Sequence, residues 1–405
     1  MKEILTATGL ALALVTTALV IIMTAVTLAF GYELSGYVAT EGRIFANDPL
    51  FPEQQNSSAS IALAPELYHQ WGNGSAMIFA PYVRLDNVDS ERTHFDIREI
   101  NYLLVNGSWE LRLGIGKVFW GTTEFVHLVD IVNQTDLVED IDGEDKLGQP
   151  MVHFAMVNDW GVIDMFVLPY FRERTFPGPE GRPRLGLIVD TDHPVYESDD
   201  EEHHTDYAFR YSHYIGALDF GVSYFTGTGR EPTFLPGMDS GGQPILIPFY
   251  ELIDQTGVDL QVVAGQWLLK LEAIHRTGQG EDFTAHIGGF EYTFVGLGGS
   301  AIDFGIIGEW AYDDRGEAAT TPYEDDTMAA VRITLNDPAG SEILAGLALD
   351  RDSSARIISV EASRRFGSGV KASLEAYAFI ELPAGDPLHS LQNDDFVSLE
   401  IAYYF

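Results

Sequence analysis

The feature that most constrains this chain is an alternation of apolar and polar side chains, repeated in segments of about ten residues. In the last segment, every second residue from Val397 to Phe405 is apolar or aromatic, whereas the residues between them include Ser398 and Glu400. Successive side chains of a β-strand point to opposite faces, so this pattern predicts a strand with one apolar and one mixed face.

The same period of two recurs from residue 32 onward. Candidate strands lie near 32–45, 57–70, 76–87, 92–105, 108–119, 150–158, 160–172, 204–214, 217–227, 245–253, 257–264, 266–277, 282–294, 301–312, 326–336, 342–350, 355–366, 369–381 and 394–405. Some of these, 245–253 above all, are also compatible with loop structure. Three long connections, near 121–149, 173–203 and 228–244, are rich in Pro, Gly and acidic residues.

Alternation alone fits either a soluble sandwich or a membrane barrel, because the two differ only in which face meets the core. The segments are longer than most strands of soluble sheets and carry charged residues in their middles. With the N-terminal and C-terminal features described below, this favours an all-β transmembrane antiparallel β-barrel. We expect about 16 strands, within a range of 14–18, and neither a separate domain nor a plug.

The N-terminal segment is the one stretch apolar enough to be a membrane helix. Residues 4–30 are almost uncharged and follow Lys2, and the small residues Ala29 and Gly31 fit a signal-peptidase site. We therefore expect residues 1–31 to be a signal peptide and 32–405 to be the barrel. The alternative is an uncleaved membrane anchor. The absence of cysteine suits passage through an oxidising periplasm.

Composition excludes some classes of function. The chain has 61 Asp and Glu against 23 Lys and Arg, for a formal charge of −38. Nucleic-acid binding needs clustered basic residues, so no nucleic-acid partner is expected. Aromatic residues gather near segment ends, as interfacial girdles require. They are Trp71, Trp109, Trp120, Trp160, Trp310, Tyr403 and Phe405.

The most distinctive stretch lies between residues 96 and 136. It contains Ile97-Arg98-Glu99, a Trp109-x-Leu111-Arg112-x-Gly114 segment, the Trp120-Gly121 pair, and then Asp130, Asn133 and Asp136 at intervals of three. This pattern resembles the large, mostly uncharacterised porin-like outer-membrane proteins of proteobacteria. The match covers roughly forty residues. The family usually has Pro near the last turn, where this chain has Gln134 and Thr135. The resemblance implies passage or export of a small, hydrophobic molecule.

The same stretch suggests a constriction. The apolar segment Val126–Val132 follows a strand and could fold inward, and a row of arginines opposite an acidic loop would create a transverse field. The alternative is that these charges only line and solvate the wall. The pore-lining and constriction candidates are Arg84, Arg98, Glu110, Arg112, Trp120, Glu124, Asp130, Asn133, Asp136, Arg210, Lys270, Glu272, Glu309, Arg332 and Glu375.

Metal and enzyme chemistry have weaker support. Asp140, Asp142 and Asp145 are weak calcium candidates, but their segment lacks the twelve-residue spacing of a calcium loop, so a solvated loop is favoured. No Gly-x-Ser-x-Gly or His-Glu-x-x-His motif is present, and the histidines are scattered. We expect no cofactor and no enzymatic activity.

The sequence therefore predicts a porin-like outer-membrane channel for passive passage or export of small molecules. A closed barrel that acts in surface binding or adhesion is the first alternative, and an outer-membrane hydrolase is the second. Expected partners are outer-membrane lipids and lipopolysaccharide, the barrel-assembly machinery and a small-molecule permeant, with homo-oligomers possible. The expected location is the outer membrane of a Gram-negative bacterium.

The chain end generates one prediction. Tyr403 and Phe405 resemble the C-terminal signal that the barrel-assembly machinery reads. Deletion of Phe405 should therefore impair barrel assembly without changing export across the inner membrane. Heat-modifiable gel mobility of outer-membrane fractions measures this, and normal levels of folded barrel in the deletion variant would contradict it.

Overall fold

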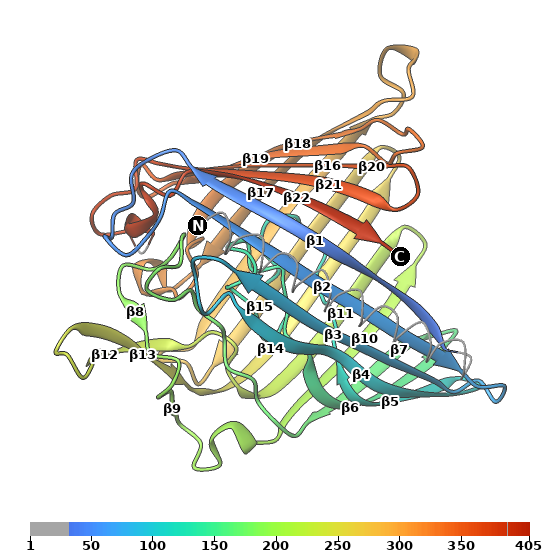
Figure 1. Ribbon diagram of the computed structural model, residues 1–405. Coiled ribbons are helices and arrows are strands. Elements are labelled where there is room, and N and C mark those ends of the chain that lie inside the picture. The colour runs from blue at the N-terminus through green and yellow to red at the C-terminus, as the bar shows by residue number, and fades with distance from the viewer. Residues whose placement is uncertain (1–31, 387) are drawn as a thin grey trace.

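The fold is a closed antiparallel β-barrel. The computed structural model describes residues 32–386 and 388–405, so the expected signal peptide, 1–31, lies outside the described residues. Eighteen strands pair with their neighbours in chain order, and β1 (Glu33–Phe45) closes the sheet against β22 (Phe396–Tyr404). Closure leaves no unpaired sheet edge (Figure 1). In the described part of the chain, no helix is long and apolar enough to span a membrane.

The other strands of the barrel follow in sequence order, each joined to the next by a turn or a loop. They are β2 (Ser57–Gln70), β3 (Ala76–Asp86), β4 (His94–Asn106), β5 (Trp109–Gly116), β6 (Gln149–Asn158), β7 (Gly161–Leu168), β10 (Asp206–Ile215), β11 (Leu218–Thr228), β14 (Leu252–Ala264), β15 (Trp267–Thr277), β16 (Phe283–Phe294), β17 (Asp303–Asp313), β18 (Asp325–Thr334), β19 (Glu342–Asp350), β20 (Arg356–Phe366) and β21 (Val370–Ile380).

The barrel has eighteen strands rather than about sixteen. Each barrel strand falls on one of the predicted segments, and the predicted segment 245–253 is the one that lies outside the barrel. It contains β13 (Pro244–Tyr250), which pairs with β12 (Thr233–Met238), β8 (Ile188–Val189) and β9 (Val195–Tyr196) in a small separate sheet. β13 is a continuous apolar run that contains Pro244 and Pro248, so its sequence does not show the alternation of a barrel strand.

The two ends of the barrel differ in their connections. At the end that holds the C-terminus, the turn end, connections are short, as at 107–108, 159–160 and 265–266. At the opposite end, the loop end, they include 117–148, 169–205 and 229–251. The small sheet of β8, β9, β12 and β13 gathers at the loop end, on the left of Figure 1.

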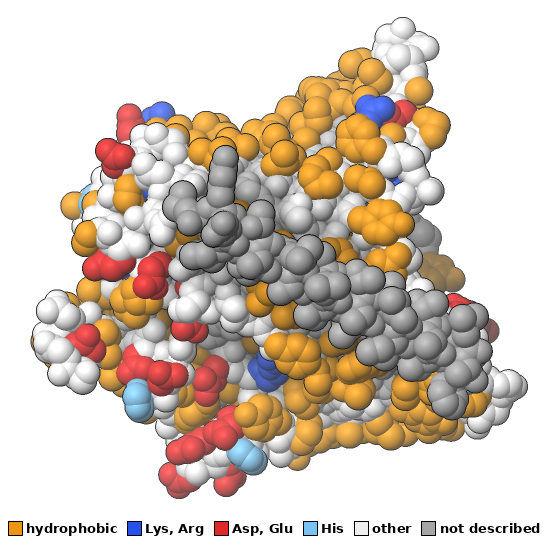
Figure 2. Space-filling view, in the orientation of Figure 1, with side chains coloured by type: hydrophobic (Ala, Val, Ile, Leu, Met, Phe, Trp, Pro, Cys, Tyr) orange, Lys and Arg blue, Asp and Glu red, His pale blue; other side chains and the backbone are white. Residues whose placement is uncertain are grey.

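The outer wall is apolar. Leu399 is 49% exposed while its neighbour Ser398 is buried, which is the alternation expected of a wall with lipid outside and polar groups inside. Figure 2 shows apolar side chains over the strands and acidic ones at the loop end. Trp71, Trp160 and Trp310 are exposed, as a girdle requires. Trp120 is not part of it, because its side chain is buried inside the barrel.

The outward face of β22 gives a test of membrane depth. Leu399 lies mid-strand and Tyr403 near the turn end, and both point outward. Leu399→Arg should lower the free energy of unfolding by about 2–4 kcal/mol, whereas Tyr403→Arg should cost about 0–1 kcal/mol, because an arginine near the interface reaches water. Urea titration of protein refolded in vesicles measures both. Equal costs at the two positions would contradict a lipid-facing wall.

Candidate functional site

The connection between β5 and β6, residues 117–148, folds into the barrel rather than away from it. We call it the lumen loop. Val129, Ile131 and Val132 are almost fully buried and pack with Phe166 and Phe225 of the wall. These three residues belong to the apolar segment that the sequence suggested would fold inward. Their burial removes apolar side chains from the polar interior and holds the loop against β7 and β11.

Asn133 ties the two ends of the lumen loop together at its neck. Its side-chain oxygen accepts a hydrogen bond from the Val118 N–H at 2.8 Å. Its amide nitrogen donates to the carbonyls of Gly116 at 3.0 Å and Leu147 at 2.8 Å. One buried side chain thereby supplies hydrogen-bond partners to three backbone groups at the neck of the loop.

Trp120 and Asp130 form a second set of contacts that hold the lumen loop together. The Trp120 N–H donates to Asp130 Oδ1 at 3.2 Å, and Lys146 Nζ lies 3.3 Å from Asp130 Oδ2. The Trp120 ring packs edge-on against Phe166, with the Arg210 guanidinium 5.5 Å from its centre. Burial raises the pKa of Asp130. Trp120, Asp130 and Asn133 of the quoted pattern thus form the internal framework of the lumen loop.

The far edge of the loop is held by carboxylates of the opposite wall. Glu272 on β15 is fully buried and accepts hydrogen bonds from the N–H groups of Thr122 at 2.6 Å, Thr123 at 3.1 Å and Val129 at 3.2 Å. Glu309 on β17 accepts from the Glu124 N–H at 2.9 Å. The wall supplies acceptors to loop backbone that has no ladder of its own.

Charged side chains add to this anchorage. Glu124 lies 3.3 Å from Lys270 Nζ and 2.7 Å from Arg332 Nη2. His127 sits between Glu272 and Glu144. Burial alone would lower its pKa, but these two carboxylates raise it to about 9. A raised histidine pKa stabilises the fold fully below the unfolded value near 6.5, and this contribution is lost as pH rises through 9.

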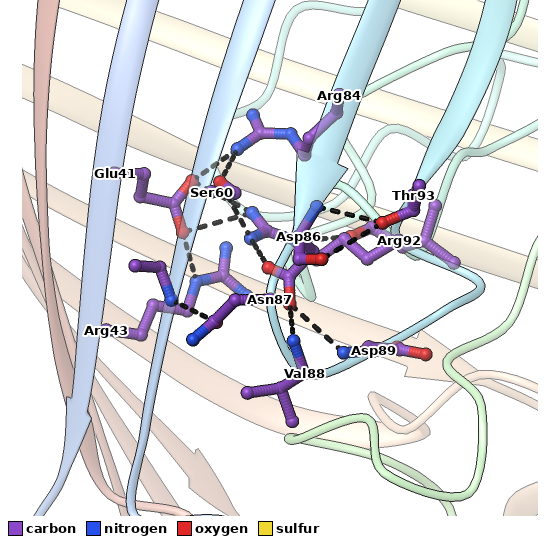
Figure 3. Close-up of polar contacts among 12 residues, drawn as sticks. Glu41, Arg43, Ser60, Arg84, Asp86, Asn87, Val88, Asp89, Arg92 and Thr93 are labelled. Carbon is purple, nitrogen blue, oxygen red and sulfur yellow. Dashed lines mark hydrogen bonds and ion pairs between the residues drawn. The ribbon is translucent and has the colours of Figure 1, made fainter. Parts of the chain in front are cut away.

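An arginine cluster lies on the wall of β1 and β3 (Figure 3). Glu41 is its centre, with Arg43 at 2.7 Å, Arg84 at 2.8 Å and Arg92 at 2.8 Å. Arg92 also pairs with Asp86 at 3.0 Å, and Arg84 donates to Ser60 Oγ at 2.6 Å. Three cations around one carboxylate leave positive charge that must be neutralised from elsewhere.

That neutralisation comes from the lumen loop. Arg43 Nη2 lies 2.9 Å from Asp140, and Arg84 Nη2 lies 2.7 Å from Glu139. Arg98 Nη2 lies 2.7 Å from Asp136. The sequence suggested a row of arginines that faces an acidic loop, with a transverse electric field between the two. The two sets are in direct contact, so the pairs fix the loop position and their field is local.

His94, Asp136 and Glu139 bring three donor atoms within 4.8 Å of one another, a spacing that a metal ion could use. The geometry favours ion pairing instead, because Arg98 contacts Asp136 and Arg84 contacts Glu139. His94 Nε2 lies 3.1 Å from Glu139. Burial raises the pKa of Glu139. The hydrogen bond with His94 and the charge of Arg84 outweigh burial and hold this pKa well below its usual range.

The lumen loop divides the interior into cavities. A turn-end cavity of about 620 Å³ and a loop-end cavity of about 700 Å³ lie on its two sides. A smaller space of about 130 Å³, here called the acidic gap, shares Ile141 and Leu391 with the loop-end cavity and Asp142 with the turn-end cavity. The acidic gap therefore lies between them, where the loop faces β19, β20 and β21.

The acidic gap has one sign of charge. Its described lining includes the carboxylates of Glu124, Asp142, Glu144 and Glu361, and no lysine, arginine or histidine. Burial and the charge of Asp140 raise the pKa of Asp142 to about 8. The remaining lining is largely apolar, with Phe125 and Phe379 among it. The carboxylates make this space electrostatically more favourable for a cation than for an anion.

The weak calcium candidates lie at this edge of the loop. Asp140 is held by Arg43 at 2.9 Å, and Asp142 Oδ1 accepts a hydrogen bond from the Glu144 N–H. Burial and the charge of Glu139 raise the pKa of Asp145 to about 6. Carboxylates that are already paired, or that resist ionisation, are poor calcium ligands.

The other predicted site residues are distributed as follows. Glu375 lines the turn-end cavity, and Arg210 pairs with Asp259 beneath Trp120. Among the described residues, Glu110 and Arg112 form no ion pair within 4.0 Å and stand outside the anchorage of the loop. Tyr403 is exposed on the outer wall, but Phe405 lies beyond β22 and contributes to the turn-end cavity.

Several residues of the site were not predicted. Arg43 and Glu41 occupy the mixed face of β1, so their alternation could have indicated them. Arg92 and Glu139 lie in connections, where alternation gives no signal. Glu361 lies on the mixed face of β20, where alternation indicates a residue that faces the interior but not one that lines the acidic gap.

Comparisons with known proteins identify no family. No protein-family model matches the sequence, and no curated protein matches it either. Among solved structures, a mutant of the Rh. blastica porin is 12% identical, with a TM-score of 0.45 over 92% of this chain and 100% of the porin. A loop-deleted form of OmpT, an outer membrane protein of Vibrio cholerae, is 9% identical, with a TM-score of 0.47 over 92% and 99%. The fold assignment rests on the strand pairing of the chain itself.

The role of Glu272 generates a prediction. Glu272→Ala should leave the N–H groups of Thr122, Thr123 and Val129 without their acceptor, and should destabilise this part of the loop by about 2–4 kcal/mol. Hydrogen exchange of these amides in lipid nanodiscs measures the loss. The matched control is Glu342→Ala, because the Glu342 side chain is exposed and, among the described residues, accepts a hydrogen bond only from Ser363 Oγ at 3.4 Å. Unchanged protection in the Glu272 variant would overturn the anchoring role.

Proposed function

We propose that this protein is a porin-type channel of the outer membrane, with a role in passive passage of small molecules rather than in catalysis. The observation that carries the proposal is the lumen loop, which is fixed across the interior between two large cavities and leaves the acidic gap between them. A loop anchored on both sides by buried carboxylates and arginines narrows a barrel without closing it off as a folded plug would.

The direction of the barrel follows from its connections. Outer-membrane barrels place short turns in the periplasm and long loops outside the cell. We therefore assign the loop end to the cell surface. The exposed acids of the connection between β7 and β10 would then meet lipopolysaccharide, with divalent ions between the two sets of anions. They include Asp192, Glu197, Asp199, Asp200 and Glu201.

The acidic gap would make the channel prefer cations. A passage of this size brings a permeating ion close to its lining carboxylates, where a low local dielectric strengthens their field. Glu124 is already paired with Lys270 and Arg332, and Glu144 with His127, so Asp142 and Glu361 remain to act on the permeant. Since the pKa of Asp142 is about 8, the preference should increase between pH 7 and pH 9.

Reversal potentials test this proposal. Protein refolded into planar bilayers under a KCl gradient should conduct, with a preference for K⁺ that rises with pH. The double variant Asp142→Asn/Glu361→Gln should reduce the preference and flatten its pH dependence, because it removes the two acids of the gap that have no basic partner among the described residues.

The matched control removes two carboxylates outside the passage. Asp352 and Glu342 are exposed at the two ends of the barrel wall, so Asp352→Asn/Glu342→Gln should leave the selectivity unchanged. Absence of conductance in the unsubstituted protein would sink the channel proposal. Conductance with no response to the gap variant would retain a channel but remove the acidic gap from its path.

A further inference from the structure

The loop-end cavity differs from the rest of the interior in its chemistry. Its volume is about 700 Å³, within the range of small-molecule sites, and its wall comes from several loops. Much of the lining is apolar. The apolar residues include Phe45, Val138, Phe176, Leu187, Phe234 and Leu246. Phe176 and Phe234 meet edge to face with ring centres 5.7 Å apart. Such a wall offers an apolar body a dry surface.

Most charged groups at this cavity already have partners. Arg43 and Arg92 belong to the cluster around Glu41, and Arg182 lies 2.7 Å from Asp394. Of the acids, Asp86 pairs with Arg92 at 3.0 Å and Glu231 with Arg276 at 3.1 Å. These pairs cancel one another locally, so they give an incoming ligand little net attraction. Asp89 has no cation within 4.0 Å among the described residues, but it accepts hydrogen bonds from the N–H groups of Glu91 at 3.0 Å and Gly178 at 3.2 Å.

Arg174 and Arg184 are different. Among the described residues, neither guanidinium has a carboxylate within 4.0 Å, although both line the cavity. Arg174 Nε donates to Gln134 Oε1 at 3.3 Å. Arg184 donates only to backbone carbonyls, those of Pro179 at 3.3 Å and Leu185 at 2.8 Å.

The surroundings of these two arginines are unfavourable for a cation that lacks a counter-ion. For Arg184 a cation–π contact with the Phe51 ring, 3.8 Å from its centre, offsets part of this cost but supplies no counter-charge. Burial lowers the pKa of both guanidinium groups, as expected where desolvation is not offset by a paired carboxylate. In a chain with an excess of acidic residues, two cations left without a carboxylate in one apolar cavity indicate an anionic group supplied from outside.

We propose that the loop-end cavity binds an amphipathic organic anion, a carboxylate with an apolar body. The carboxylate would take the free guanidinium donors of Arg174 and Arg184, because the planar guanidinium fork matches a carboxylate. The apolar body would lie against Phe176, Phe234 and Leu246. The two arginines and the apolar wall select an amphipathic anion only together. A neutral apolar molecule would leave the arginines unpaired, and a small anion would leave the apolar wall uncovered.

The binding site is inferred independently of the proposed function, but its effect on ion flow rests on that function. In a channel with an acidic gap below the cavity, a bound anion would be repelled from the gap and retained at the mouth. It should therefore obstruct cation flow when added from the loop-end side, and pass through poorly itself.

Binding is tested first, without any current. The probe is 6-phenylhexanoate, titrated by calorimetry into the full chain in lipid nanodiscs, with empty nanodiscs to correct for partition into lipid. The neutral 6-phenylhexanol and the cationic 6-phenylhexylammonium share its body. We expect the carboxylate to bind more tightly than either by about tenfold or more. Equal binding of all three would overturn the role of the arginines.

The variants keep the test specific. Arg174→Gln and Arg184→Gln should each weaken binding of the carboxylate by about tenfold and leave the alcohol unchanged. The matched control is Arg365→Gln, because Arg365 lies near the turn end, over the Tyr404 ring, and also lacks a carboxylate within 4.0 Å among the described residues. Heat-modifiable mobility verifies that each variant is folded. If Arg184→Gln does not fold, Arg174→Gln and Phe234→Ala test the head and body contacts separately.

Current recordings then separate this inference from the proposed function. Reduction of K⁺ current by 6-phenylhexanoate from the loop-end side, lost in Arg174→Gln, supports both. Binding to a barrel that never conducts would retain the site and overturn the channel. Conductance without binding, or binding that ignores both arginines, would overturn the site and retain the channel.

Discussion

The structure depends on the ion pairs and hydrogen bonds that hold the lumen loop against the barrel wall. A closed barrel satisfies its own backbone, but a loop inside it has no ladder and must find acceptors and donors among wall side chains. Glu272 and Glu309 supply acceptors on one side, while Arg43, Arg84 and Arg98 supply donors on the other. The cavities and the acidic gap exist only where this anchorage leaves space.

Burying the charged groups of this anchorage costs free energy, and this cost explains why they are arranged in pairs. Burying an unpaired charge costs several kcal/mol, so a buried carboxylate or guanidinium is stable only with its partner in place. Glu41 shares three arginines, and two of these reach onward to Glu139 and Asp140 of the loop. Because each pair stabilises the next, the loop has one favourable position rather than several. A fixed gap follows from the network, not from the rigidity of any single contact.

The sequence predicted the wall well and the interior only in part. β2 and β19 begin and end where alternation placed them, because one face of each strand must meet lipid. Trp120 was expected both at the interface and in the constriction, since a tryptophan beside a strand end fits either, and only the fold of the loop places it inside. Pairings such as Arg43 with Asp140 join residues far apart in the chain, and no local pattern specifies them.

Charge is distributed unevenly along the interior, and its sign changes between the loop-end cavity and the acidic gap. Of the eighteen arginines, fourteen lie within 4.0 Å of a carboxylate, so a cation without one is an exception in this acidic chain. Two of the exceptions, Arg174 and Arg184, lie at the loop-end cavity, whereas the acidic gap below it is lined by carboxylates alone among charged groups. In the proposed channel, an anion bound at the loop-end cavity would therefore be repelled at the acidic gap, whereas a cation would be attracted there. The two proposed sites would thus favour opposite charges, so that one barrel could pass one class of solute and retain another.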